Sequence, residues 1–143
     1  MKFSTAIVSA ILALTPAIGA VQLQYDTVYD NAGQSMLTVA CSDGENGLAS
    51  RFPTFGSVPG FPHIGAADAV GGFNSPNCGA CFQVTYTNSQ GTTRSIKVVA
   101  IDHAGSGFNV AQAAMDELTG GQAVALGRID VQSQRLSPSD CGL

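Results

Sequence analysis

Alternation of apolar and polar residues recurs along the chain and predicts mostly strands. Residues 22–29, 81–87, 94–102 and 127–136 alternate with a period of two, as a strand with one buried face does. The polar stretch NSQGTT separates the second of these segments from the third, so the two are expected to form an antiparallel hairpin. The apolar run at 36–41 (MLTVAC) favours one more, well-buried strand.

One segment has a helical period instead. In 109–120 (NVAQAAMDELTG) apolar residues recur at helical spacing, with Asn109 as a candidate N-cap and Gly120 as a C-terminal stop. Prolines and glycines are concentrated in 42–81, which predicts a long structured loop with at most a helical turn near 66–70. About six strands and one helix, without strand–helix–strand alternation, favour a small, mainly β barrel.

The N-terminal segment 1–20 has the layout of a secretory signal peptide. Lys2 is positive, 3–18 is mostly apolar, and the small residues that follow predict cleavage after Ala20. The apolar run is shorter than the ~20 residues of a membrane-spanning helix, and no other segment approaches that length. We therefore expect an exported chain without a membrane span, whose residues 21–143 form a single domain.

The charge of the chain limits its partners. Six Lys and Arg residues stand against ten Asp and Glu residues, for a formal net charge of −4. Nucleic acid is therefore not an expected partner. Charged residues make up only 11% of the chain, whereas Gly, Ser, Thr, Asn and Gln are plentiful. Such a surface suits neutral ligands, carbohydrates among them, and no cofactor is indicated.

The four cysteines are Cys41, Cys78, Cys81 and Cys141. In a small exported domain they are expected to form two disulfides. A strand pattern follows Cys81, so the helix that supports a thioredoxin-type Cys-x-x-Cys is missing, and without a second close pair the metal signal is weak. A Cys78–Cys81 ring would restrict the unfolded chain little, so both should bond outward. The residues alone leave the two outward connectivities open.

Several segments together resemble the cerato-platanin family of small secreted fungal proteins. They follow one another over nearly all of 21–143, and they are YDTVYD, VACSDGENGL (39–48), FPTFGSVPGFPHIG (52–65), GGFNSPNCGACFQV (71–84), AIDHAGSGFNV (100–110) and the final Cys141. The resemblance implies a six-stranded double-psi β-barrel with short helices, related to the first domain of expansins and to some endoglucanases. It also implies the pairings Cys41–Cys78 and Cys81–Cys141.

The same resemblance implies a function. Cerato-platanins are described as non-enzymatic proteins of the culture medium and fungal cell wall that bind chitin-type N-acetylglucosamine oligomers and loosen cellulosic material in an expansin-like way. They self-assemble at air–water interfaces and elicit plant defence, which implies a host receptor, and some relatives are allergens. A monomer is expected in solution. The alternatives are a low-activity endoglucanase and a surface-active protein whose sugar binding is incidental.

The relation to barrel hydrolases draws attention to Asp102, which ends a predicted strand where those enzymes place an acid. A glycosidase needs two carboxylates ~5–9.5 Å apart. Asp26 and Asp43 could supply the second, but the resemblance provides no catalytic base. We therefore expect a shallow groove that binds sugars without cutting them. It is centred on Asp102, and around it are expected polar groups of Tyr25, Asp26, Ser42, Asp43, Asn74 and Asn109.

Several of these residues also have an ordinary structural explanation. Asn109 could cap its helix, Asn74 could hold the loop before Pro76, Tyr25 could be core, and Asp43 could close an Asx turn. His103 is expected to face away from Asp102, because adjacent strand residues point to opposite sides. His63, in the proline-rich loop, has no evident partner.

The aromatic residues differ from those of the family. Relatives commonly carry tryptophan near Gly72 and after the cysteine that begins the strand at 81–87. This chain has Phe73 and Phe82 at those places and no Trp. Without an indole to stack on sugar rings, we expect weak, hydrogen-bonded binding of short soluble glycans in place of tight adsorption to crystalline cellulose.

Overall fold

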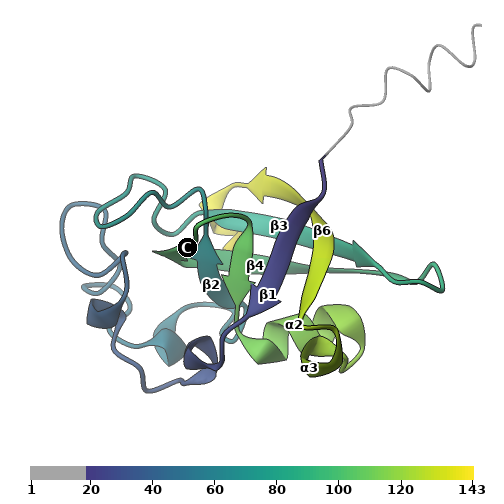
Figure 1. The fold of residues 1–143 in the computed structure, drawn as a ribbon. Helices are drawn as coiled ribbons and strands as arrows, with labels where there is room; N and C mark the ends of the chain where they lie inside the picture. Colours follow the sequence, from purple (N-terminus) through teal and green to yellow (C-terminus); the bar gives the residue numbers. More distant parts are fainter. Residues whose placement is uncertain (1–18) are drawn as a thin grey trace, which may run out of the picture.

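Six strands close into a barrel in the computed structural model, which describes residues 19–143 (Figure 1). The predicted signal segment 1–20 therefore lies almost entirely outside the described residues. The strands are β1 (Val21–Tyr25), β2 (Ile64–Ala67), β3 (Cys81–Thr87), β4 (Thr93–His103), β5 (Phe108–Val110) and β6 (Arg128–Leu136). Their order around the barrel is β1-β5-β2-β4-β3-β6. The prediction of a mainly β, six-stranded barrel is confirmed.

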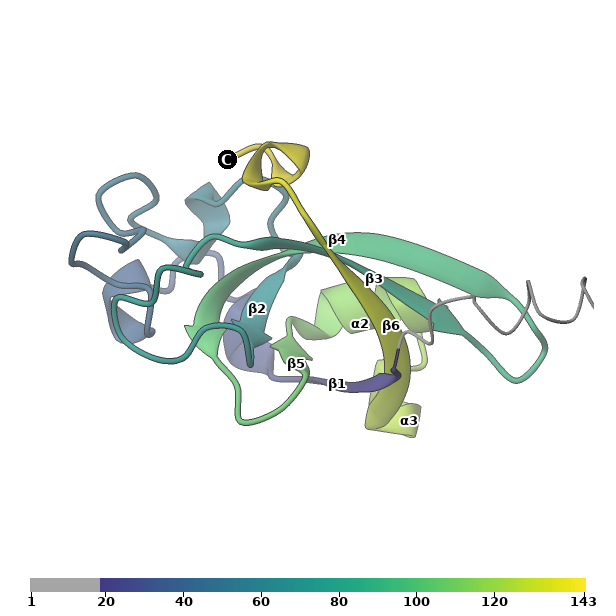
Figure 2. The ribbon, with the colours of Figure 1, turned by 90° about the horizontal axis from the view of Figure 1, so that it is seen from above.

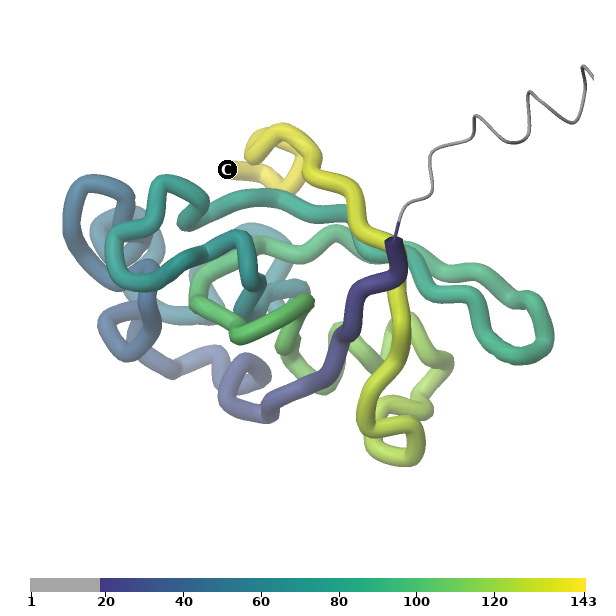
Figure 3. The backbone as a smooth tube through the Cα atoms, turned by 45° about the horizontal axis from the view of Figure 1, so that its top comes forward, coloured from purple at the N-terminus to yellow at the C-terminus, as the bar shows by residue number. Residues whose placement is uncertain are grey.

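Two of the six strand pairs are parallel and the other four are antiparallel. β1 runs parallel to β5 and β2 runs parallel to β4, whereas β1 lies antiparallel to β6 along one side of the barrel (Figure 3). The predicted hairpin is present as β3 and β4, with Val84 opposite Ile96. Its far end projects beyond the barrel wall (Figure 1).

Short helices lie against the barrel on one side, and long loops lie on another (Figure 2). The helices are α2 (Gln112–Thr119) and α3 (Ala123–Leu126), and the loops carry the 3₁₀ turns η1 (Thr27–Asp30), η2 (Met36–Thr38), η3 (Phe55–Ser57) and η4 (Pro138–Cys141). Among residues 19–143, none of the helices has the length and apolar character needed to span a bilayer.

The start of the predicted helix is wrong, whereas its end is confirmed. Asn109 belongs to β5, and Ala111 occupies the N-cap position of α2. The free N–H groups of the first turn are satisfied from elsewhere: the Asp30 carboxylate accepts from Gln112 N at 2.8 Å and Ala113 N at 3.0 Å. Gly120 ends the helix in the left-handed conformation, with φ 68°.

Two further expectations fail in the loop region. Residues 36–41 form the turn η2 and an irregular segment instead of a strand, because this apolar run buries Met36 and Cys41 without strand pairing. The loop at 42–81 contains β2, where a helical turn was expected. All four residues of β2 are buried, so it shows no alternation by which to recognise it.

The two disulfides join Cys41 to Cys78 and Cys81 to Cys141, as the family resemblance implied. They close segments with sequence separations of 37 and 60 residues. The chain-entropy model assigns about 4 kcal/mol of stabilisation to each loop of this length. The first disulfide anchors the loops, and the second fastens the C-terminal turn to the start of β3.

Candidate functional site

A row of register partners crosses four strands on the outside of the barrel. Gln24 of β1 is opposite Asn109 of β5, Asn109 is opposite Ala66 of β2, and Ala66 is opposite Asp102 of β4. Residues directly opposite one another in a sheet point to the same face. Leu23, the neighbour of Gln24 in β1, is fully buried in the core, so Gln24 and its row face outward.

Small residues lie in β2 at and next to the middle of this row. A Cβ on Gly65 would lie 2.5 Å from the backbone oxygen of Asn109 and 2.6 Å from Cα of Val110. β2 and β5 can therefore approach this closely only with glycine at position 65. Ala66 is itself buried, so the side chains of the row that reach the surface are the polar ones of Gln24, Asn109 and Asp102.

A hollow of about 360 Å³ opens beside the β1–β5 end of the row. Arg128 contributes a guanidinium to it, and Arg128 Nη2 donates to Gln24 Oε1 at 3.4 Å. The remaining wall is mostly amide, hydroxyl and backbone, and the complete lining is Gln22, Gln24, His103, Ala104, Gly105, Ser106, Phe108, Asn109 and Arg128. The lining contains no carboxylate.

Asn109 lines this hollow, and its amide oxygen is buried without a hydrogen-bond partner. It is the one such side-chain atom among residues 19–143. Leaving a buried acceptor unsatisfied costs about 1–3 kcal/mol, so native proteins rarely retain one without a reason. Rotation of the Asn109 amide toward the hollow would let a ligand donor reach this oxygen and recover that cost.

Asp102 lies at the other end of the row, and both of its oxygens accept hydrogen bonds from the protein. Oδ1 accepts from Ala40 N at 3.0 Å and from His103 N at 2.8 Å. Oδ2 accepts from the Tyr29 hydroxyl at 2.8 Å. A carboxylate offers about four acceptor positions, so roughly one remains for a ligand. Asp102 therefore holds the loops in place and has little capacity left for direct binding.

Tyr29 is nearly fully buried next to this carboxylate. Burial, the hydrogen bond to Asp102 and the charges of Asp102 and Asp26 all raise the pKa of the Tyr29 phenol. Asp26 thus lies close to the Tyr29–Asp102 pair. Its own carboxylate caps η1 by accepting from Val28 N at 3.0 Å, and the side chain is exposed.

Asn74 is connected to the same region through the backbone of Ala40. Asn74 N donates to Ala40 O at 3.4 Å. Asn74 joins two loops, because its side-chain Oδ1 accepts from Asn46 N at 2.7 Å and its backbone oxygen accepts from Asn46 Nδ2 at 3.1 Å. Ser42 is buried and Asp43 is exposed in the adjoining loop. These three residues lie around the loops beside Asp102, outside the lining of the hollow.

Tyr25 is set apart from the row. It is opposite Val110, whose side chain is in the core, and Tyr25 itself packs against the core. The histidines also have structural partners: the His103 ring contacts Val70 O through Nδ1 at 2.6 Å, and the His63 ring contacts the Glu117 carboxylate. The expectation that His63 lacks a partner is wrong, because Glu117 comes from α2, 54 positions away.

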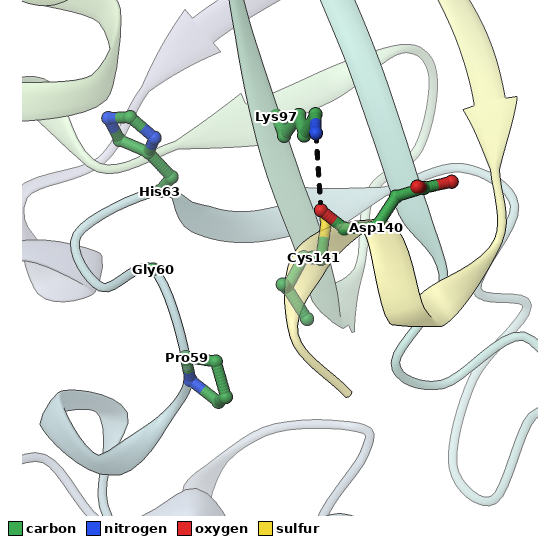
Figure 4. Close-up of a pocket in the computed structure, with 7 residues that line it drawn as sticks. Pro59, Gly60, His63, Lys97, Asp140 and Cys141 are labelled. Atoms are coloured by element: carbon green, nitrogen blue, oxygen red, sulfur yellow. Dashed lines mark hydrogen bonds between the residues drawn. The ribbon is translucent and has the colours of Figure 1, made fainter.

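A smaller hollow of about 160 Å³ lies between the His63 loop and the C-terminal turn (Figure 4). Its lysine, Lys97, already donates to Asp140 O at 3.3 Å, and its histidine is paired with Glu117. The part of the chain described by the structure contains no group of three or more His, Cys, Asp or Glu arranged to hold a metal ion.

Sequence reasoning missed Gln22, Gln24, Tyr29 and Arg128 as members of this region. The signal for Gln22 and Gln24 was present, because the alternation in 22–29 puts them on its polar face. The same alternation assigned Tyr29 to a strand face, but β1 ends at Tyr25, so Tyr29 turns inward from η1. Arg128 had no local signal, since only barrel closure brings β6 next to β1.

Comparison with known proteins identifies the class to which this barrel and its polar row belong. The family model for cerato-platanin matches residues 21–143. The chain therefore belongs to the cerato-platanin family, a group of secreted fungal proteins generally regarded as non-enzymatic.

Individual relatives match over almost the whole chain. Allergen Asp f 15 of Aspergillus fumigatus is 48% identical, with 99% of this chain and 97% of the relative covered. Cerato-platanin of Ceratocystis fimbriata f. sp. platani is 39% identical, with 99% and 96% covered. The crystal structure of cerato-platanin 2 from M. perniciosa has a TM-score of 0.85 at 70% identity, covering 87% of this chain and 100% of that one.

Proposed function

We propose that residues 21–143 form an extracellular, wall-associated fungal protein that binds N-acetylglucosamine oligomers in the hollow beside Asn109 without hydrolysing them. The observation that carries this proposal is the buried, unpartnered Oδ1 of Asn109, a residue that lines a carboxylate-free, amide-lined hollow. An acetamido N–H is a donor without an acceptor atom of its own, so it complements an isolated acceptor.

The remaining wall suits the rest of such a sugar. The amides of Gln22 and Gln24 can both donate to and accept from hydroxyl groups, and the Arg128 guanidinium can donate to an acetamido carbonyl. Ligand sites commonly combine a concave floor with a few polar groups that set orientation. With Phe108 buried in the core, no aromatic platform dominates the hollow, and the affinity is expected to be modest.

The positions of the carboxylates support binding without cleavage. No Asp or Glu lines the hollow. Asp102 already accepts three hydrogen bonds, Asp26 caps η1, and Asp43 is exposed in a neighbouring loop. General acid and base catalysis of glycoside hydrolysis needs two carboxylates on opposite sides of the bond to be cut.

Similarity to a solved relative supports the wider biological role in this proposal. One solved relative is described as a fungal elicitor, with a TM-score of 0.73 at 39% identity over 85% of this chain and 96% of its own. We extend to this chain elicitation of plant defence through a host receptor, and expansin-like loosening of cellulosic material. The signal segment predicted at 1–20 supports its export.

Assembly at air–water interfaces is a second candidate function, favoured by exposed apolar side chains. Leu37, Phe73 and Val124 are each more than 60% exposed, and Val28 and Leu126 are partly exposed. Phe73 thus stands at the surface, in contrast to Phe82, which is in the core. Film formation by the oxidised protein, weakened by Leu37→Ser together with Phe73→Ser, would support this candidate.

A glycan panel with a reducing-sugar assay on the same preparation tests the main proposal. We expect saturable binding of N-acetylglucosamine oligomers, weaker binding of glucose oligomers of equal length, and no release of reducing ends. Equal affinity for N-acetylglucosamine and glucose oligomers would show that the acetamido group is not recognised. Steady release of reducing ends, abolished in Asp102→Asn, would show that the protein is a hydrolase and not only a binding protein.

A further inference from the structure

A second polar cleft, of about 450 Å³, lies between the β3–β4 hairpin and the end of α2 with α3. It shares no lining residue with the hollow beside Asn109. Residues of the hairpin line one wall and residues at the ends of the helices line the other. Figure 1 shows that the hairpin extends past the barrel. Nothing in the proposed function uses this cleft.

The hairpin wall combines an aromatic ring with a guanidinium. Tyr86 and Arg94 are directly opposite one another in the β3–β4 register, so their side chains point to the same face of the hairpin. Val84 and Ile96 precede them on that face and are buried in the barrel. Where the hairpin extends beyond the barrel, this same face therefore lines the cleft instead of the core.

Arg94 lies against the C-terminal end of α2. A Cβ on Gly120 would be 2.7 Å from Arg94 Nη1, so glycine at position 120 leaves room for the guanidinium as well as permitting the left-handed cap. The last carbonyls of a helix carry partial negative charge and favour a cation there. The C-terminal end of α2 therefore favours a guanidinium at this place in the cleft.

Arg94 is the only charged side chain among the residues that line the cleft. Arg94 has no carboxylate oxygen within 4.0 Å among residues 19–143, where the His63–Glu117 contact is the one ion pair found. No Asp or Glu lines the cleft. Although the chain has a net charge of −4, the cleft is therefore locally positive, and the N–H donors of the Arg94 guanidinium are available to a ligand.

The other polar groups of the wall add donors and apolar surface. Asn88 Oδ1 accepts from Gln90 N at 3.0 Å and Thr92 N at 2.9 Å, so the hairpin turn occupies the oxygen and leaves the Nδ2 donors free. Gln122 contributes an amide, and Tyr86 and Leu126 contribute apolar surface. This is the lining expected for a sugar that presents hydroxyl groups, C–H faces and a carboxylate.

From this cleft we infer a second carbohydrate site that takes a uronate-bearing oligosaccharide, with Arg94 binding its carboxylate and Tyr86 packing on its ring. A planar carboxylate matches the guanidinium fork with two parallel hydrogen bonds. A neutral glycan leaves that fork without its anionic partner. The inference does not depend on the binding of N-acetylglucosamine oligomers beside Asn109.

The test is a calorimetric titration of the full mature chain with tetragalacturonate, alongside its fully methyl-esterified form. We expect saturable binding of the acid and at least about tenfold weaker binding of the ester. Arg94→Gln should weaken tetragalacturonate binding by a similar factor. The matched control Arg51→Gln removes the same charge from another exposed arginine, 43 positions before Arg94 in the sequence. It should change binding less than twofold.

Separate results would overturn the inference. These are absence of saturable binding by tetragalacturonate, equal affinity for acid and ester, and equal losses in the two arginine variants. Melting temperatures equal to the parent would show that both variants fold. Binding of N-acetylglucosamine tetramer by Arg94→Gln, measured on the same sample, separates failure of this site from failure of the site beside Asn109.

Discussion

The Tyr29 hydroxyl donates to Asp102 Oδ2 at 2.8 Å, joining η1 to the end of β4 across 73 positions of the chain. The same carboxylate holds Ala40 N, so a single side chain organises two loops beside the polar row. The acid that attracts attention by its relation to hydrolases is thus mainly a positioning residue. The polar atom without a partner is on Asn109.

Replacing Asp102 by Asn should therefore destabilise the fold. An amide keeps one acceptor oxygen for three donors and loses the charge that strengthens each bond, so we expect a loss of about 1.5–3 kcal/mol in the free energy of unfolding. Urea denaturation of the oxidised protein measures it. Asp43→Asn, at an exposed loop position, should stay within about 0.5 kcal/mol of the parent. Equal stability of both variants would contradict the positioning role.

Tyr29 should make stability fall at alkaline pH. Its pKa is raised in the folded state, so the stabilisation is complete below the pKa of an unfolded tyrosine, about 10, and declines as the pH rises above that value. Tyr29→Phe should flatten this part of the stability profile, whereas Tyr86→Phe should leave it unchanged. Unfolding midpoints recorded across the alkaline range provide the measurement. A profile that is the same in both variants would rule out Tyr29 as its origin.

The two disulfides should differ in their effect on binding. Cys41 follows Ala40, which donates to Asp102, and Cys41 N donates to Ile101 O at 3.1 Å. Removing either bridge by a double Cys→Ser change should cost about 4 kcal/mol. Removal of Cys41–Cys78 should also weaken binding of N-acetylglucosamine oligomers at temperatures where the variant is folded, because these loops adjoin the row.

The variant without Cys81–Cys141 is the matched control, since it frees the C-terminal turn instead. Its affinity should remain close to that of the parent when both are measured below their melting temperatures. If the two double variants lose affinity to the same extent, the loops beside Asp102 have no special part in the site.

Asn109→Leu should separate function from stability. The leucine has a similar size and removes a buried acceptor that lacks a partner, so stability should be equal to or above that of the parent. Affinity for N-acetylglucosamine oligomers should nevertheless fall at least about tenfold. Gln134→Leu, on the outer face of β6, is the control for a surface amide. Retained affinity in Asn109→Leu would show that its amide contacts no ligand.

The strands that could be predicted are those with one buried and one exposed face. β6 shows this alternation clearly, β3 and the first half of β4 show it in part, and the structure confirms all three within a residue or two. β2 is buried on both faces and β5 has three residues, so neither has a readable period. Both lie in or next to glycine-rich segments, where turns are the ordinary expectation.

The site was less accessible to prediction than the fold, because its contacts are between distant segments. The Asp30 carboxylate caps α2 from 82 positions away, which removes the helix-capping explanation of Asn109. Asp102 was recognised from its place at a strand end, but its hydrogen bonds with Tyr29 and Ala40 exist only once the loops have folded over β4. Local sequence patterns do not reveal such contacts between distant segments.

The most direct test of the central claim is a titration of isotope-labelled mature protein with N-acetylglucosamine tetramer, followed by amide chemical shifts. Shifts should concentrate on the β1 and β5 amides around Gln24 and Asn109 and on the loop at 104–106, and the Asn109 side-chain amide should move with the same saturation curve. Perturbations confined to the β3–β6 face or the hairpin cleft, with Asn109 unmoved at saturation, would contradict it.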